Sequence, residues 1–231
     1  MDQKFLQLQP RLQRLADLVP AHARLADIGT DHGYLPVWLM QHGRINGAIA
    51  SDVGQEPLQH AQRTAKEYGV SGIDFRLCDG LAGILPEEAD TVVIAGMGGQ
   101  TIIHILDATP WTKNGTLLLL QPMTKAELLR VWLTANGYTI EREHLVRDKA
   151  YLYPVLQVKG GRREALTLAE EYGGIGLEDD PLYDTYLTRK IESLHRAIDG
   201  IHHAGSGGNM EKLQQLECIR QALTEKKGTL K

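Results

Sequence analysis

Short apolar runs alternate with amphipathic stretches over residues 1–160, and most of these runs end at a glycine or a polar turn. A short apolar run bounded in this way predicts a buried strand, whereas apolar residues spaced three or four apart predict a helix. The expected strands are 25–28, 45–53, 73–78, 91–94, 117–120, 138–145 and 150–158. The expected helices are 3–19, a segment from Tyr34 to the stop at His42-Gly43, 58–68, a segment that ends at Leu106, and 125–135.

This alternation predicts an α/β fold, a Rossmann-like doubly wound, mostly parallel seven-stranded sheet. The continuous apolar run Thr91-Val92-Val93-Ile94 is typical of a central strand that is buried on both faces. The last two strands follow one another directly, so one of them is expected to be antiparallel. Pro154 lies within the last strand and predicts an edge position or a bulge there, because proline cannot donate a ladder hydrogen bond.

The pattern changes after Gly160-Gly161, where strands no longer alternate with helices. Asp179-Asp180-Pro181 predicts a helix start, and apolar residues at helical spacing follow it. A second apolar series at 213–223 comes after a glycine-rich turn at 204–209. Helices joined by a short loop pack antiparallel. We therefore expect a main domain over 1–160 and a helical hairpin arm over 161–231.

Residues 25–36 read Leu-Ala-Asp-Ile-Gly-Thr-Asp-His-Gly-Tyr-Leu-Pro and predict a strand, a glycine turn and a helix start. Gly29 and Gly33 can adopt positive φ angles and let a ligand approach the backbone. A dinucleotide-binding turn has the spacing G-x-G-x-x-G, but Asp31 occupies the second glycine position and would repel a diphosphate. A carboxylate here suits S-adenosylmethionine, which carries a sulfonium, an ammonium and no phosphate. An ordinary turn between strand and helix is the alternative for these residues alone.

Three consecutive predicted strands end in acidic residues, namely Asp27, Asp52 and Asp79. The carboxyl ends of parallel strands meet at one edge of a sheet, so the three carboxylates are expected to share a crevice. Asp52 lies at the distance along the chain where an acidic side chain accepts hydrogen bonds from ribose hydroxyls, and Asp79 can accept from an adenine amino group. The crevice therefore favours an adenosine cofactor.

The composition and charge of the chain further limit the class of protein that it can be. The chain has 231 residues, 42% of them hydrophobic and 23% charged, which suits a globular domain with a small appendage. Its net charge is −4, but residues 51–90 alone contain three basic and eight acidic residues, so a polyanion is expected to bind elsewhere. Arg11 and Arg14 are expected on a solvated helix face. Two distant cysteines, no apolar leader and no long apolar run predict a cytoplasmic protein without membrane insertion.

Five motifs together carry a family resemblance: Ala26–Pro36, Ser51–Val53, Cys78–Leu81, Ile94–Gly99 and Leu119–Pro122. They resemble the class I bacterial tRNA (adenine-N1)-methyltransferases that modify adenine-22, and the resemblance covers nearly the whole chain. It implies a C-terminal coiled-coil hairpin, S-adenosylmethionine as cofactor and tRNA as partner. The chain departs from the family pattern at Met123, where asparagine is usual, and at Pro154, where glutamate is usual.

The resemblance also implies which residues form the site. Adenine N1 lies on the pairing edge of the base, so the base must leave its stack before methylation. Tyr34 is the candidate stacking residue, Asp31 the candidate acceptor or charge stabiliser, and His32 a further polar contact. The expected cofactor-binding residues are Asp27, Gly29, Gly33, Asp52, Val53, Asp79, Gly80, Ala95, Gly96 and Met97. No metal and no protein partner are expected.

The sequence leaves two other classes of protein as alternatives. A non-enzymatic RNA- or nucleotide-binding protein with this fold would not need all three strand-end acids. A methyltransferase of small molecules or proteins would not need the helical arm, and its binding would not fall steeply with salt.

Overall fold

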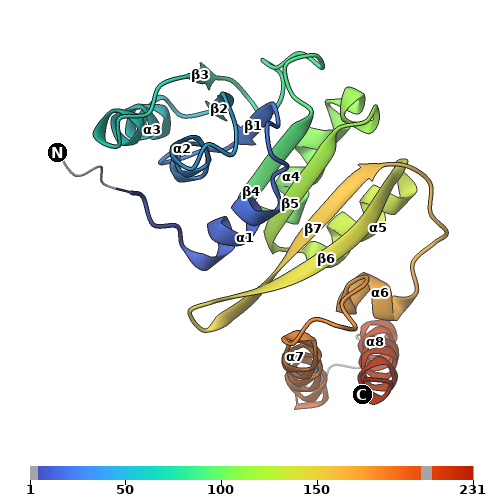
Figure 1. Cartoon of the computed structure of the whole chain (residues 1–231). Helices are drawn as coiled ribbons and strands as arrows, with labels where there is room; N and C mark the ends of the chain where they lie inside the picture. The colour runs from blue at the N-terminus through green and yellow to red at the C-terminus, as the bar shows by residue number, and fades with distance from the viewer. Residues whose placement is uncertain (1–4, 204–209, 231) are drawn as a thin grey trace.

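The computed structural model describes residues 5–203 and 210–230, and its centre is a seven-stranded sheet (Figure 1). The strands are β1 (Leu25–Ile28), β2 (Ala48–Asp52), β3 (Ile73–Leu77), β4 (Thr91–Gly98), β5 (Leu117–Thr124), β6 (Tyr138–Asp148) and β7 (Tyr151–Gly160). Their order is β3-β2-β1-β4-β5-β7-β6. The pairs among β1 to β5 are parallel, and β7 runs antiparallel to both of its neighbours. The predicted doubly wound, mostly parallel α/β sheet is confirmed.

Helices cover both faces of this sheet. The helices of the described residues are α1 (Pro10–Leu18), α2 (Tyr34–Gln41), α3 (Gln55–Glu67), α4 (Gly99–Asp107), the 3₁₀ helix η1 (Pro110–Lys113), α5 (Ala126–Ala135), α6 (Leu168–Gly173), α7 (Tyr183–His203) and α8 (Met210–Gly228). Val92 packs in the core under α4 and α5, whereas its neighbour Val93 packs in the core under α1 and α2. Because successive side chains of a strand point to opposite faces, β4 needs apolar residues at every position. This explains its unbroken apolar run.

The N-terminal helix begins later than predicted. The apolar spacing predicted a helix from residue 3, but residues 5–9 are extended and α1 begins at Pro10. Proline disfavours helical geometry in the residue before it and is well tolerated at the first helical position. The extended segment places Leu6 against Val37 of α2 and Ala65 of α3. The apolar residues of this segment therefore contribute to packing without forming a helix.

Strand β7 is an interior strand, so the edge position predicted from Pro154 is wrong for the strand as a whole. The pairing of β5 with β7 extends only to Leu120 opposite Leu156. Pro154 lies beyond this point and pairs with Leu145 of β6 on one side. Proline is tolerated here because the side without a β5 partner requires no N–H donor. The two strands fork at this point, close to the carboxyl end of β5.

The C-terminal region packs against the outer part of the sheet. Helices α7 and α8 lie side by side (Figure 1), and Leu187 and Leu223 of these helices join Leu145 of β6 in one apolar cluster. The short helix α6 was not predicted, although Thr167 and Glu170 form a capping box at its start. The predicted turn at 204–209 lies outside the described residues. No helix of the described chain is long and apolar enough to cross a bilayer.

A buried ion pair between α5 and β6 helps to fix this region to the sheet. Arg130 of α5 and Glu143 of β6 are both fully buried, and Arg130 Nε and Glu143 Oε1 lie 2.8 Å apart. Arg130 also donates to the carbonyl of Glu171, and Glu143 accepts from the backbone N–H of Ile175. The segment after α6 is therefore held by groups that belong to the sheet and to α5.

Candidate cofactor and substrate site

The candidate site lies at the carboxyl ends of β1 and β4, where the strand order reverses. In doubly wound folds this switch point forms the ligand crevice. Two cavities open there, and Gly29 lines both. The first is lined by Arg11, Asp27, Asp31, His32, Tyr34, Ala95 and Gly96, among others. The second is lined by Asp52, Val53, Asp79, Gly80 and Met97, among others. The structure thus brings together every predicted site residue except Gly33.

Gly29 occupies the junction between the cavities. Its φ angle is +69°, and a Cβ built on it would lie 2.1 Å from the Met97 methyl carbon. The positive φ favours glycine at this position, and the Met97 methyl group occupies the space that a Cβ would take. Met97 therefore packs on the turn where the two cavities meet.

Gly33 also has a positive φ, of +67°, but it lines neither cavity. A Cβ on Gly33 would lie 2.9 Å from the Cβ of Ala61 in α3. Its missing side chain lets α3 pack close to the start of α2. In this structure Gly33 shapes the site through helix packing.

Asp27 is buried at the end of β1, and its Oδ2 accepts a hydrogen bond of 2.7 Å from the Thr30 hydroxyl. Burial raises the pKa of the Asp27 carboxyl to about 6, the Thr30 hydrogen bond opposes this, and the nearby charge of Asp52 adds to it. A cation bound beside Asp27 would favour the ionised carboxylate. The residue therefore suits a ligand that carries a sulfonium and an ammonium group.

This pKa predicts a pH dependence of cofactor binding. Below pH 6 the carboxyl must lose a proton before it can pair with a cation, so affinity for S-adenosylmethionine should rise as pH increases through 6 and level off above it. The expected change between pH 7.5 and pH 5 is about tenfold. Calorimetry in buffers with different ionisation enthalpies should detect proton release near pH 5.5. Asp27→Asn should bind weakly with a flatter pH profile; a profile identical to that of the wild type would contradict this role.

The second cavity has the groups that an adenosine moiety requires. The Asp52 carboxylate is oriented by the N–H groups of Gly54, at 2.9 Å, and Asp31, at 3.4 Å. Its remaining lone pairs can accept from ribose hydroxyls. Asp79 lies in the same cavity, and the 68% exposed side chain of Val53 gives it an apolar rim. These residues fit the predicted ribose and adenine contacts.

Asp31 and His32 lie on the loop between β1 and α2, and Tyr34 is the first residue of α2. Asp31 has a positive φ of +52°, which asparagine and aspartate tolerate better than most residues. The His32 ring stacks on the Tyr34 ring at a centroid distance of 5.1 Å and on the His60 ring of α3, also at 5.1 Å. The three rings form a column beside the first cavity. Sequence reasoning missed His60 because only the packing of α3 against the loop places it there.

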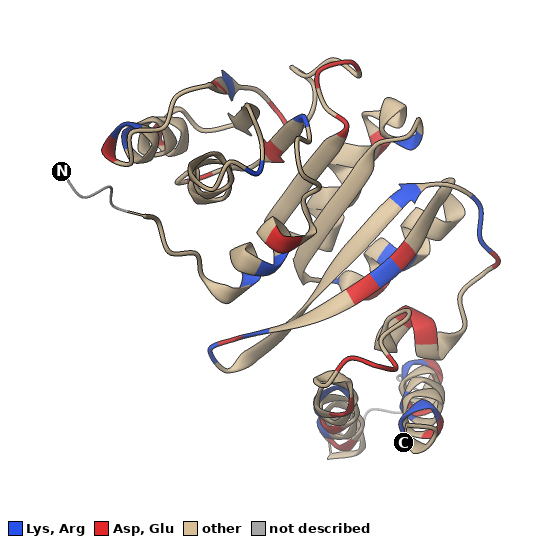
Figure 2. Ribbon diagram, viewed as in Figure 1, with Lys and Arg blue, Asp and Glu red and all other residues tan. Residues whose placement is uncertain are grey.

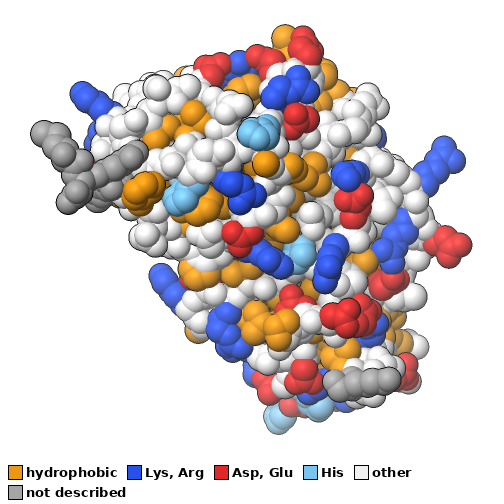
Figure 3. All heavy atoms as spheres, viewed as in Figure 1, with side chains coloured by type: hydrophobic (Ala, Val, Ile, Leu, Met, Phe, Trp, Pro, Cys, Tyr) orange, Lys and Arg blue, Asp and Glu red, His pale blue; other side chains and the backbone are white. Residues whose placement is uncertain are grey.

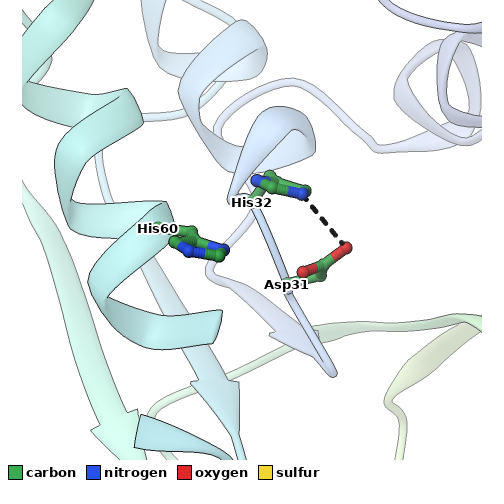
Figure 4. A group of neighbouring side chains, drawn as sticks. All are labelled: Asp31, His32 and His60. Carbon is green, nitrogen blue, oxygen red and sulfur yellow. Dashed lines mark ion pairs between the residues drawn. The ribbon is translucent and has the colours of Figure 1, made fainter. Parts of the chain in front are cut away.

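Asp31, His32 and His60 also have atoms that could bind a metal ion, and these atoms lie within 4.8 Å of one another (Figure 4). A metal ion must lie near the plane of each imidazole that binds it, because the nitrogen lone pair lies in that plane. The two imidazole planes differ by only 6° and face each other, so their lone pairs do not converge on one point. The arrangement is an aromatic stack, and Asp31 Oδ2 lies 3.7 Å from His32 Nε2.

Arg11 of α1 is a site residue whose role was predicted wrongly. It is not on a solvated face: its Nε donates to Asp148 at 2.7 Å and its Nη1 donates to Gln121 at 3.1 Å. The same Gln121 oxygen accepts the N–H of Gly96, at 3.3 Å. Arg11 therefore supports the glycine turn after β4 and forms part of the wall of the first cavity.

Arg14, one turn further along α1, is likewise bound to the sheet. Its Nη2 donates to His144 Nδ1 at 2.7 Å, and His144 Nε2 donates to Gln157 at 2.8 Å. Burial and the neighbouring arginines lower the pKa of His144, which suits the neutral ring that these bonds require. Both arginines fix α1 to β6, and Arg11 also joins it to β5.

The charges on this face are interspersed. Basic and acidic residues alternate around the turn between β6 and β7 (Figure 2). In the space-filling view, Lys and Arg side chains lie among exposed hydrophobic ones and form no single large patch (Figure 3).

Comparison with known proteins agrees with this site. Residues 8–156 match the methyltransferase domain family. The tRNA (adenine(22)-N(1))-methyltransferase of Bacillus subtilis is 37% identical over 187 residues, which cover 80% of this chain and 76% of that protein. The crystal structure of the B. subtilis m1A22 tRNA methyltransferase TrmK superposes with a TM-score of 0.86 at 32% identity, covering 95% of this chain and 98% of the other.

A second solved structure carries a bound cofactor product. TrmK of M. capricolum in complex with S-adenosylhomocysteine superposes with a TM-score of 0.80 at 26% identity. The match covers 97% of this chain and 99% of the other. The likeness therefore includes both the strand-end crevice and the C-terminal helices.

Proposed function

The chain belongs to the tRNA (adenine(22)-N(1))-methyltransferase family, and we infer that it transfers a methyl group from S-adenosylmethionine to N1 of an adenine in tRNA. The observation that carries this inference is the pair of cavities that meet at Gly29. One offers a buried carboxylate for a cationic group and the other offers Asp52 and Asp79 for adenosine. We place this reaction, like its tRNA substrate, in the cytoplasm.

The substrate base occupies the first cavity beside Asp31 and Tyr34 in this proposal. S-adenosylmethionine supplies an electrophilic methyl group on a positively charged sulfur. Adenine N1 has its own lone pair, so no residue has to remove a proton before attack. The chain must hold the unpaired base in line and stabilise the positive charge that develops on it. Tyr34, which is 37% exposed, supplies a stacking surface, and Asp31 supplies the negative charge.

A transfer assay tests this function against its alternatives. We expect labelled methyl groups from S-adenosylmethionine to enter total bacterial tRNA and to be recovered as 1-methyladenosine after digestion to nucleosides. Label in proteins or small molecules in place of tRNA would favour the other methyltransferase classes. Tight tRNA binding with no transfer to any acceptor would favour the non-enzymatic binding protein.

The helical region 161–231 is the proposed tRNA-binding arm. Arg196 of α7 and Lys212 of α8 are exposed, and phosphate contacts need accessible cations. We expect Arg196→Glu combined with Lys212→Glu to weaken tRNA binding roughly tenfold and to reduce its salt dependence, with cofactor affinity unchanged. Filter binding over a salt series would measure both effects. The matched control is Lys66→Glu, on an exposed position of α3; an equal loss in this control would contradict a specific role for the arm.

A further inference from the structure

A groove lies in the fork where β5 and β7 separate. Residues from the end of β5, the start of α5, the start of β7 and helix α7 line it. Among them are Pro122, Met123, Lys125, Tyr151, Tyr153 and Lys190. The fork exists because pairing between the two strands ends at Leu120 and Leu156. Both positions at which the chain departs from the family pattern, Met123 and Pro154, lie in this groove.

Two tyrosines form one wall of the groove. Tyr151 and Tyr153 lie on the same face of β7, since they are two residues apart, and their ring centroids are 6.1 Å apart. The Tyr151 side chain is 65% exposed, although burial of a tyrosine ring is usually favourable. An exposed aromatic ring beside a groove offers a stacking surface to a flat ligand.

Arg11 connects this groove to the cavity proposed for the target base. Its guanidinium carbon lies 5.2 Å from the centroid of the Tyr153 ring, and its Nη1 lies 3.3 Å from the Met123 sulfur. The same side chain lines the first cavity together with Asp31 and Tyr34. Arg11 therefore lies between the first cavity and the groove, in contact with residues of both.

Two lysines also line the groove. Lys125 is exposed at the start of α5, and the Lys190 ammonium lies 5.5 Å from the centroid of the Tyr186 ring. Glu127 is an acidic residue of the lining. Arg189 of α7 donates to the carbonyl of Ala150, which holds the β6–β7 turn and its exposed Tyr151 against α7. Cations and aromatic rings thus line the same groove.

We propose that this groove binds the unpaired RNA strand next to the methylated adenine, with a base stacked on Tyr151 and its phosphates near Lys125 and Lys190. The proposal rests on the proposed tRNA methyltransferase function. Aromatic rings interleaved with cations are the arrangement that binds single-stranded nucleic acid, because the rings stack on bases and the cations follow the backbone. A duplex would keep its bases stacked inside and would use only the cations.

The test uses a tRNA transcript with 2-aminopurine at the nucleotide on either side of the target adenine. Its fluorescence increases when the base leaves its stack and is quenched when it stacks on an aromatic ring. We expect one of the two probes to be quenched in the wild-type complex, to brighten with Tyr151→Ala and to stay quenched with Tyr151→Phe. Tyr151→Ala should weaken tRNA binding by about 5- to 100-fold. Tyr151 is exposed, and unchanged binding of S-adenosylhomocysteine would show that the variant is folded.

The charge contribution is tested with Lys190→Glu against the same Lys66→Glu control. We expect only the first to weaken tRNA binding and to reduce the salt dependence. Loss with Lys190→Glu but none with Tyr151→Ala would overturn the stacked-strand proposal in favour of backbone contacts to a duplex. Wild-type behaviour of both variants would exclude RNA from the groove.

The two experiments distinguish a failure of the groove proposal from a failure of the proposed function. If the wild-type protein methylates the transcript and the variants behave like it, the groove proposal fails and the proposed function stands. If the wild-type protein makes no 1-methyladenosine but shows the expected quenching, the proposed function fails and the groove stands as an RNA-binding site.

Discussion

Asp31→Asn is expected to lower the rate of methyl transfer at saturating cofactor and tRNA by about 10²- to 10³-fold. Positive charge develops on the base as N1 gains the methyl group, and a carboxylate beside the first cavity stabilises that charge more in the transition state than in the ground state. The side chain is 66% exposed in the free protein, so water screens it until the base covers it. The substitution keeps the size of the side chain and tolerates the positive φ angle of Asp31.

Single-turnover kinetics, with cofactor and tRNA affinities measured separately, would test this expectation. Both affinities should change by only a few fold, because the charge is needed mainly after binding. The matched control is Asp79→Asn, which removes a carboxylate from the second cavity and should raise the Kd of the cofactor with little effect on the rate at saturation. A wild-type rate for Asp31→Asn would remove Asp31 from the mechanism.

Arg130→Ala is expected to destabilise the protein by about 3–5 kcal/mol, because it leaves the fully buried Glu143 without its cation. The lost side chain also donates to the Glu171 carbonyl, so the C-terminal region should loosen from the sheet. Urea unfolding, followed by tryptophan fluorescence, would give the free energy of unfolding for each variant.

The control for this prediction replaces both partners. Arg130→Met with Glu143→Leu removes the two charges together and retains apolar volume, so the double variant should recover much of the lost stability. A small loss, under about 1 kcal/mol, for Arg130→Ala would mean that the ion pair contributes as little as an exposed pair.

The sheet and most of its helices were predictable because their signals are local. The central strands of the doubly wound part, β1 and β4, contain unbroken buried runs, and Asp27, Asp52 and Asp79 mark the strand ends by their position alone. The fold rule that gathers parallel strand ends at one edge then brings these acids together. The family motifs added the identity of the cofactor and the substrate.

The features that were missed depend on contacts between distant segments. Arg11 lies 137 residues from Asp148 and 110 from Gln121, so its helix looked solvated when considered alone. His60 joins the aromatic column only because Gly33 lets α3 approach closely. Pro154 predicted an edge position or a bulge, but the order β5-β7-β6 places it at a fork inside the sheet. A single sequence does not specify that order.

The most direct measurement of the central claim is the position of the methyl group. A tRNA transcript is incubated with the wild-type protein and labelled S-adenosylmethionine, then cleaved with a base-specific ribonuclease and analysed by mass spectrometry. We expect one methyl group per tRNA, on N1 of adenine-22, and none on a transcript in which that adenine is replaced by guanine. Methylation of another base or another atom, or equal methylation of the replaced transcript, would contradict it.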